Sequence, residues 1–145
     1  MRVMYAVLFC SLSLLAGITA AVAAPNASWN FVAKEQGNVA FWIRDKEGSC
    51  EEQKNATPLV FRTKNLKAGA ASGPLQVKEL AYCFLLDPDI GTDASFNCAS
   101  GSVEFTYDAA ANEYRGKYDL TMKNKAVRRG EFHAQFCAPT TPVKK

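Results

Sequence analysis

Apolar and polar side chains alternate with a two-residue period in the C-terminal third of the chain. In the first of three such segments, Val103, Phe105 and Tyr107 alternate with small or charged polar residues. This period indicates β-strands with one buried and one solvated face. Because short polar turns separate the segments, we expect a three-stranded antiparallel meander. Its strands are predicted at residues 102–107, 114–123 and 130–136.

The rest of the chain also has the pattern of strands. Apolar, β-branched and aromatic residues cluster in short runs that glycine, proline and aspartate separate, and no run has a helical period. About seven short strands in one chain favour an all-β fold, a small antiparallel β-sandwich or barrel. The further strands are predicted at residues 28–33, 38–44, 58–63 and 75–86, the last with room for one break.

Residues 1–23 have the organisation of a signal peptide. Arg2 precedes a nearly continuous apolar run from Met4 to Ile18, and the small residues Ala21 and Ala23 suit a signal peptidase. The rival interpretation is a membrane anchor, but this run is shorter than the ~20 residues that span a bilayer. We therefore expect cleavage after Ala23, a single domain over residues 24–145 with no membrane span, and a secreted or periplasmic protein.

Composition excludes several classes of function. Without the signal peptide the chain has 16 lysines and arginines and 14 aspartates and glutamates, so its net charge is only +2. Such a weak field argues against binding nucleic acid with the whole surface. A charged fraction close to the globular average argues against a disordered protein, and about 120 residues are too few for a multidomain enzyme.

Four cysteines remain after the signal peptide, an even number that predicts two disulfides in an exported protein. A zinc site is the weaker alternative because no C-x-x-C pair is present. Cys98 and Cys137 lie at opposite ends of the predicted meander, ~20 Å apart, too far for a disulfide. We favour Cys83–Cys98 with Cys50–Cys137, and keep Cys50–Cys98 with Cys83–Cys137 as the alternative.

The meander resembles the closing hairpins of small bacterial exported and lipoprotein-type β-sandwich domains. The likeness rests on Gly101-Ser102-Val103, on Tyr114-Arg-Gly-Lys-Tyr118, and on residues 130–137, which fit G-x-F-x-A-x-x-C. It covers residues 101–137. The resemblance implies an exported β-domain, and it implies no activity because those domains are largely uncharacterised.

Candidate catalytic and metal-binding residues are few. His133 is the single histidine; it lies on the polar side of its predicted strand and belongs to no nucleophile or zinc motif. We expect no cofactor and no enzyme activity, although distant carboxylates that meet in space leave a small hydrolase open. Asp87, Asp89 and Asp93 surround a glycine and form a partial calcium-loop pattern, which is also ordinary turn chemistry.

A cluster of cations is the most prominent charge feature. Six cations and one aspartate between residues 115 and 129 give this hairpin a net charge of +5. Such a local field is suited to an acidic polysaccharide or an acidic envelope protein. A solvated face with lysines that protect a sheet edge is the ordinary alternative. The cations are Arg115, Lys117, Lys123, Lys125, Arg128 and Arg129.

Three functions therefore stay open on the sequence alone. The first is an exported, non-catalytic binding or inhibitor module of the cell envelope, with an unidentified envelope protein or acidic polysaccharide as its partner. The second is a structural or accessory envelope protein without a discrete site. The third is a small hydrolase that depends on carboxylates.

Overall fold

The computed structural model describes residues 24–31, 38–52, 58–86 and 96–138, which form eight β-strands and one short 3₁₀ turn, η1. The prediction of an all-β fold is confirmed. The elements are β1 Ala27–Phe31, β2 Val39–Ile43, β3 Leu59–Thr63, β4 Ser72–Gln76, η1 Val77–Glu79, β5 Leu80–Leu85, β6 Cys98–Asp108, β7 Glu113–Met122 and β8 Val127–Phe136.

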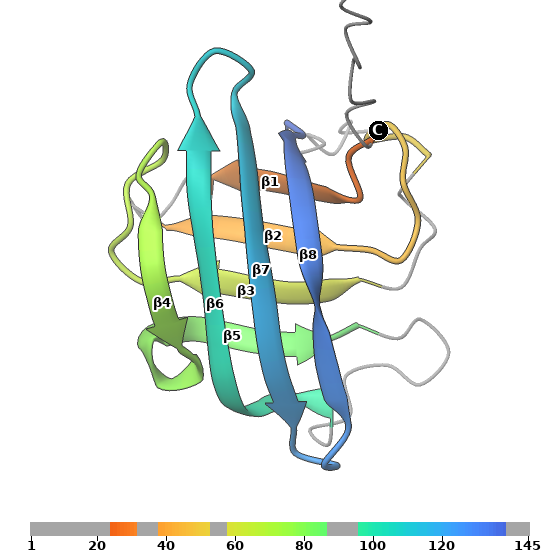
Figure 1. Ribbon diagram of the computed structural model, residues 1–145, viewed down its shortest axis with the longest axis vertical. Helices are drawn as coiled ribbons and strands as arrows, with labels where there is room; N and C mark the ends of the chain where they lie inside the picture. The colour runs from red at the N-terminus through yellow and green to blue at the C-terminus, as the bar shows by residue number, and fades with distance from the viewer. Residues whose placement is uncertain (1–23, 32–37, 53–57, 87–95, 139–145) are drawn as a thin grey trace, which may run out of the picture.

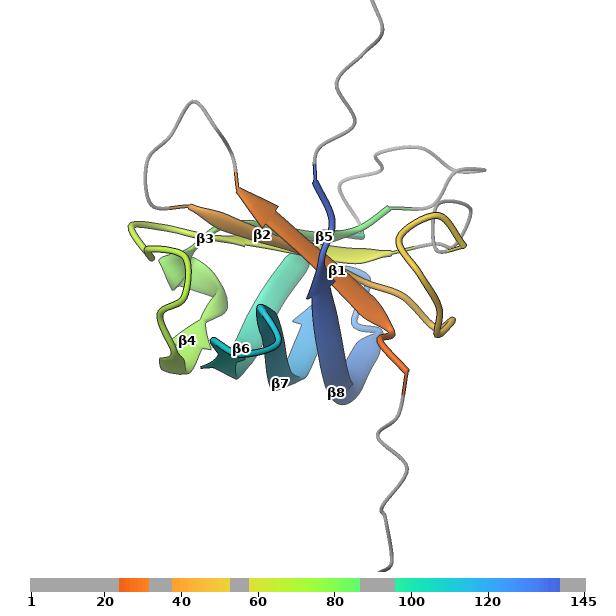
Figure 2. The same ribbon diagram turned by 90° about the horizontal axis from the view of Figure 1, so that it is seen from above.

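The strands form one mixed sheet in the order β4-β6-β7-β8-β1-β2-β3-β5, which is nearly closed into a barrel. In Figure 1, β1, β2, β3 and β5 cross behind β4, β6, β7 and β8 at a steep angle. Figure 2 shows the same strands as two layers, one above the other. Two layers that cross in this way enclose a core between their inner faces.

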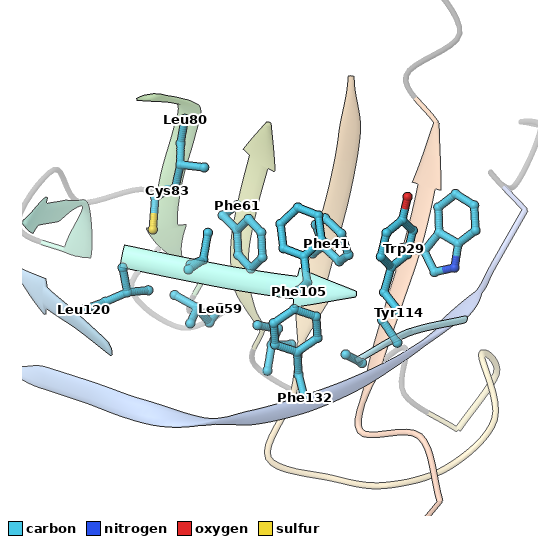
Figure 3. Close-up of a cluster of buried hydrophobic side chains, with 14 of the residues drawn as sticks. Trp29, Phe41, Leu59, Phe61, Leu80, Cys83, Phe105, Tyr114, Leu120 and Phe132 are labelled. Atoms are coloured by element: carbon cyan, nitrogen blue, oxygen red, sulfur yellow. The ribbon is translucent and has the colours of Figure 1, made fainter. Parts of the chain in front are cut away.

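Aromatic rings fill the space between the layers (Figure 3). Phe41 lies at the centre, with its ring 4.8 Å from that of Phe61, 5.0 Å from Phe105 and 5.2 Å from Tyr114. All four side chains are at most 3% exposed. Phe105 and Tyr114 come from inward positions of β6 and β7, whose apolar and polar residues alternate, whereas Phe41 comes from β2, which is apolar at every position.

Both disulfides join the pairs that the sequence favours. Cys50 is bonded to Cys137, with 5.8 Å between the Cα atoms, and Cys83 is bonded to Cys98, with 5.3 Å. The first bond ties the loop after β2 to the end of β8, and the second ties β5 to the start of β6. Two disulfides are typical of proteins from an oxidising compartment.

The C-terminal meander is present as predicted, with β7 antiparallel to both β6 and β8 along nearly its whole length. Elsewhere the structure differs in two ways. The predicted strand 75–86 has the one break that it allowed for, at η1, but β4 begins earlier, at Ser72, inside a segment expected to be a loop. In addition, β1 pairs with β8 in parallel in the middle of the sheet, whose edges are β4 and β5.

Candidate functional site

The outer face of the meander carries a shallow groove with a volume of about 740 Å³. Its floor includes Phe105, Gly116 and Phe132, which are direct neighbours across β6, β7 and β8. Because the two phenylalanine rings point into the core, these residues present backbone to the groove. The floor is therefore rigid sheet, and the side chains that rise from it belong to the alternate, outward positions of the same strands.

Two segments outside the meander raise the walls of this groove. The start of β4, at Ala71, Ser72 and Gly73, lines the side next to β6. Ala24, Asn26 and Glu47 also line the groove, and Asn26 lies against β8. The groove thus depends on the closed sheet, because these wall residues are far from the meander in sequence.

Asn26 fixes the second wall by bonding to the edge of β8. Its Nδ2 donates to the carbonyl of Glu131 at 3.2 Å, and its Oδ1 accepts from the backbone N–H of His133 at 2.8 Å. The side chain thus occupies the place of a strand residue at this edge. Gln135 holds the neighbouring loop by donating to the carbonyl of Gly48 at 2.7 Å.

Carboxylates alternate with cations across the groove. Lys117 lies between Glu104 and Glu131 in the register of the three strands, and its Nζ is 2.6 Å from Glu104 Oε1. The hydrogen bond to Glu104 raises the pKa of Lys117, and the charges of Glu104 and Glu131 add to this effect. The negative charges of Glu104 and Glu131 therefore neutralise the charge of Lys117, and this part of the groove has no excess positive charge.

Arg115 differs from Lys117 because no carboxylate within the described residues pairs with its guanidinium. It is exposed, lines the groove, and has Thr106 and His133 as its neighbours across the strands. The His133 Nε2 is 2.5 Å from Glu113 Oε2, so this imidazole faces a carboxylate of its own. Within the described residues, no side chain occupies the five donors of Arg115, so they can bind an anionic group in the groove.

The structure disperses the six cations of the predicted basic hairpin. Lys123 lies beyond the end of β7, and Lys125 occupies the turn before β8. Arg129 is paired with Asp119, with 2.9 Å between Nε and Oδ1, whereas Arg128 lies opposite Leu120 and so on the other side of the sheet from Arg115. The hairpin therefore lacks the continuous positive face that the sequence suggests.

The structure leaves two further predictions untested. Asp87, Asp89 and Asp93 of the predicted calcium loop lie outside the described residues, as does the predicted signal peptide. Within the described ranges, no three histidine, cysteine, aspartate or glutamate side chains come together as metal ligands. The same part of the chain contains no helix that is long and apolar enough to cross a membrane.

Sequence reasoning missed the acidic side of the groove. Glu104 and Glu131 are visible in the pattern as outward residues, and their meeting around Lys117 follows from the strand register alone. No local pattern placed Asn26 and Glu47 at the groove, because they reach it through the long-range parallel pair of β1 with β8.

Comparison with known proteins adds no relative: no protein-family model, no curated protein and no solved structure matches this chain.

Proposed function

We propose that the protein is an exported, non-catalytic binding module of the cell envelope, secreted or periplasmic, that holds an acidic saccharide in the groove of the meander. The observation that carries this proposal is Arg115, an exposed guanidinium without a carboxylate partner among the described residues, in a groove of about 740 Å³. That volume suits a small oligosaccharide segment, since ligand sites usually measure ~300–1,000 Å³.

The charges around Arg115 define the chemistry of the ligand. A guanidinium binds a carboxylate or phosphate through two parallel hydrogen bonds. Glu47, Glu104 and Glu131 line the same groove, and carboxylates accept hydrogen bonds from sugar hydroxyls or amines. They would repel a second anion close to the first. The groove therefore suits a saccharide with widely spaced acidic groups, such as a uronic acid unit between neutral sugars.

A densely charged polyanion fits this surface less well. Of the six cations that suggested such a ligand, Lys117 and Arg129 are held by Glu104 and Asp119. Binding through these two side chains would break existing ion pairs. A groove ligand recognised by Arg115 requires no such loss.

The experiment compares two variants with the same change in charge. Arg115→Glu alters the groove, whereas Lys123→Glu alters an exposed site in the turn after β7. The probe is a tetrasaccharide with one glucuronic acid unit between neutral sugars, and its methyl ester serves as the uncharged control ligand. Because a charge-assisted bidentate contact contributes about 1.5–3 kcal/mol, Arg115→Glu should weaken binding by about 10–100-fold, measured by titration calorimetry.

Lys123→Glu should leave the affinity nearly unchanged, and the esterified tetrasaccharide should bind far more weakly than the acid. Equal losses in both variants would show that only the overall charge matters and would overturn the proposal. Wild-type protein that does not bind the acid at all would overturn it as well.

A small hydrolase is the second candidate, because Glu104 and Glu131 both line one groove. Two carboxylates that flank a bound sugar are the usual requirement for glycoside hydrolysis. Glu131→Gln should then abolish the release of reducing ends from the tetrasaccharide while its binding persists. A wild-type protein that binds the tetrasaccharide and leaves it intact supports the binding module instead.

A further inference from the structure

The N-terminal half of β8 has a partner on only one side. β7 pairs with β8 from Val127 to Gln135, but β1 pairs with it only from Ala134 to Phe136. Asn26 extends the contact on the β1 side as far as Glu131. In Figure 1, β8 continues beyond β1 toward the β7–β8 turn.

The hydrogen-bond pattern shows which backbone groups face this open edge. The N–H of His133 and the carbonyl of Glu131 both bond to Asn26, so these odd-numbered residues point away from β7. In an antiparallel pair the direction alternates with every residue. The N–H and C=O of Val127 and Arg129, together with the N–H of Glu131, therefore face the open edge. No strand within the described residues pairs with them.

A cleft of about 470 Å³ lies beside this edge. Ile43 and Leu59, which are 3% and 5% exposed, lie at its base with Leu85, at the ends of β2, β3 and β5. Tyr118 lines it too, and Val127 is 51% exposed at its border. The edge thus combines backbone donors and acceptors that no described strand pairs with and a cleft of mixed polar and apolar lining, which could receive the side chains of an added strand.

Three arginines and one aspartate among the described residues line this cleft: Arg44, Arg128, Arg129 and Asp45. Arg129 is paired with Asp119, and Arg44 donates to Ser28 and to the carbonyl of Trp42, so the exposed Arg128 is the cation that an incoming acidic group would meet. Arg128 lies opposite Leu120, on the side of the sheet that faces the core, and projects beside Tyr118. Acidic groups are therefore favoured in whatever occupies the cleft.

We propose that an extended, acidic peptide segment of a partner protein binds here by adding a strand to β8 at Val127–Glu131. Its backbone pairs with Val127, Arg129 and Glu131, an aliphatic side chain packs against the exposed Val127, and a carboxylate meets Arg128. A second copy of this chain fits less well, because an antiparallel pair of β8 edges centred on Arg129 would place like charges opposite each other. This site is separate from the saccharide groove.

The first test uses a fluorescent, capped pentapeptide of alternating glutamate and valine, and its lysine–valine counterpart as the control. We expect saturable binding of the acidic peptide to the oxidised protein, at least ~10-fold tighter than that of the basic peptide, by anisotropy. The proposal would be overturned if both peptides bind equally or if the acidic peptide does not bind. It would also be overturned if the protein instead forms a concentration-dependent dimer through this edge.

The second test isolates the backbone donor. Arg129→Ala removes the charge and keeps the N–H, whereas Arg129→Pro removes both. Because this N–H points away from β7, proline costs no hydrogen bond of the β7–β8 ladder. Arg129→Pro should bind the acidic peptide at least ~5-fold more weakly than Arg129→Ala, as expected for one lost hydrogen bond. Equal affinities would rule out strand addition.

Hydrogen exchange tests the proposal on the wild-type protein, so it does not require any variant to fold. In the wild-type protein, saturating acidic peptide should slow exchange of the Val127, Arg129 and Glu131 amides by ~10-fold or more. Unchanged exchange at these amides would overturn the proposal. Arg115→Glu should bind the peptide as the wild type does, so failure of the saccharide site and failure of this one are distinguishable.

Discussion

Gly116 is the residue on which both the core and the groove depend. A Cβ atom at this position would lie 2.7 Å from the ring of Phe132 and 2.3 Å from the carbonyl of Glu104. The absence of a side chain lets the Phe132 ring cross over β7 toward Phe41, 5.6 Å away. The glycine thus makes room in the core for the Phe132 ring directly beneath the floor of the groove.

Gly116→Ala should destabilise the protein by about 1–3 kcal/mol, because a buried methyl group there forces the backbone or the Phe132 ring to move. The free energy of unfolding in urea measures this change. Gly73→Ala is the matched control, since a Cβ on that glycine meets nothing within 4 Å. It should change stability by no more than about 0.5 kcal/mol. Equal effects of the two substitutions would contradict this account of Gly116.

At the scale of elements, the Cys50–Cys137 disulfide helps to hold one wall of the groove in place. It fastens the segment after β2, which carries Glu47, to the chain just beyond β8. The bridged cysteines are 87 residues apart, whereas Cys83 and Cys98 are 15 apart. The longer loop removes more conformational freedom from the unfolded chain.

Replacing Cys50 and Cys137 together by alanine should therefore lower the free energy of unfolding by about 4–5 kcal/mol. The same change at Cys83 and Cys98, which close the shorter loop, should lower it by about 3 kcal/mol. Urea unfolding of the oxidised proteins measures the loss. A loss well under 1 kcal/mol for the Cys50–Cys137 pair would mean that this bond adds no restraint. Because total stability is typically ~5–15 kcal/mol, the expected loss is a large share of it.

The sequence predicted the elements of the meander well because each of its strands alternates regularly, and the same pattern separated Cys98 from Cys137. It predicted β5 and a break before it, but it missed the start of β4 at Ser72, since Gly73 and Pro74 suggest a loop. The groove could not be predicted from local sequence patterns. Its walls depend on the parallel pair of β1 with β8 and on the β4–β6 pair, which join segments far apart in the sequence.

The whole molecule should lose stability in alkaline solution. Burial raises the pKa of Tyr114, although the hydrogen bond from the Gly69 N–H opposes this shift, and burial also raises the pKa of Tyr118. The unfolded chain therefore releases these protons first as the pH rises through about 10. The stability that these two buried hydroxyls contribute is fully present below that pH, and it is lost as the pH rises through their pKa values in the folded protein.

Urea midpoints measured between about pH 9 and pH 11 test this expectation. Tyr118→Phe should reduce the alkaline loss, because phenylalanine has no proton to release. If the stability of the wild-type protein stays constant or rises over this range, folding does not raise the pKa values of these two hydroxyls, and the account is wrong.

The most direct test of the saccharide groove is a nuclear magnetic resonance titration of the ¹⁵N-labelled, oxidised protein with the tetrasaccharide that carries one glucuronic acid unit. We expect the largest amide shifts at Arg115 and at its neighbours Thr106, Gly116 and His133, and small shifts in the turn at residues 123–126. Shifts concentrated in that turn, or no shifts at a saturating concentration of the tetrasaccharide, would contradict the account.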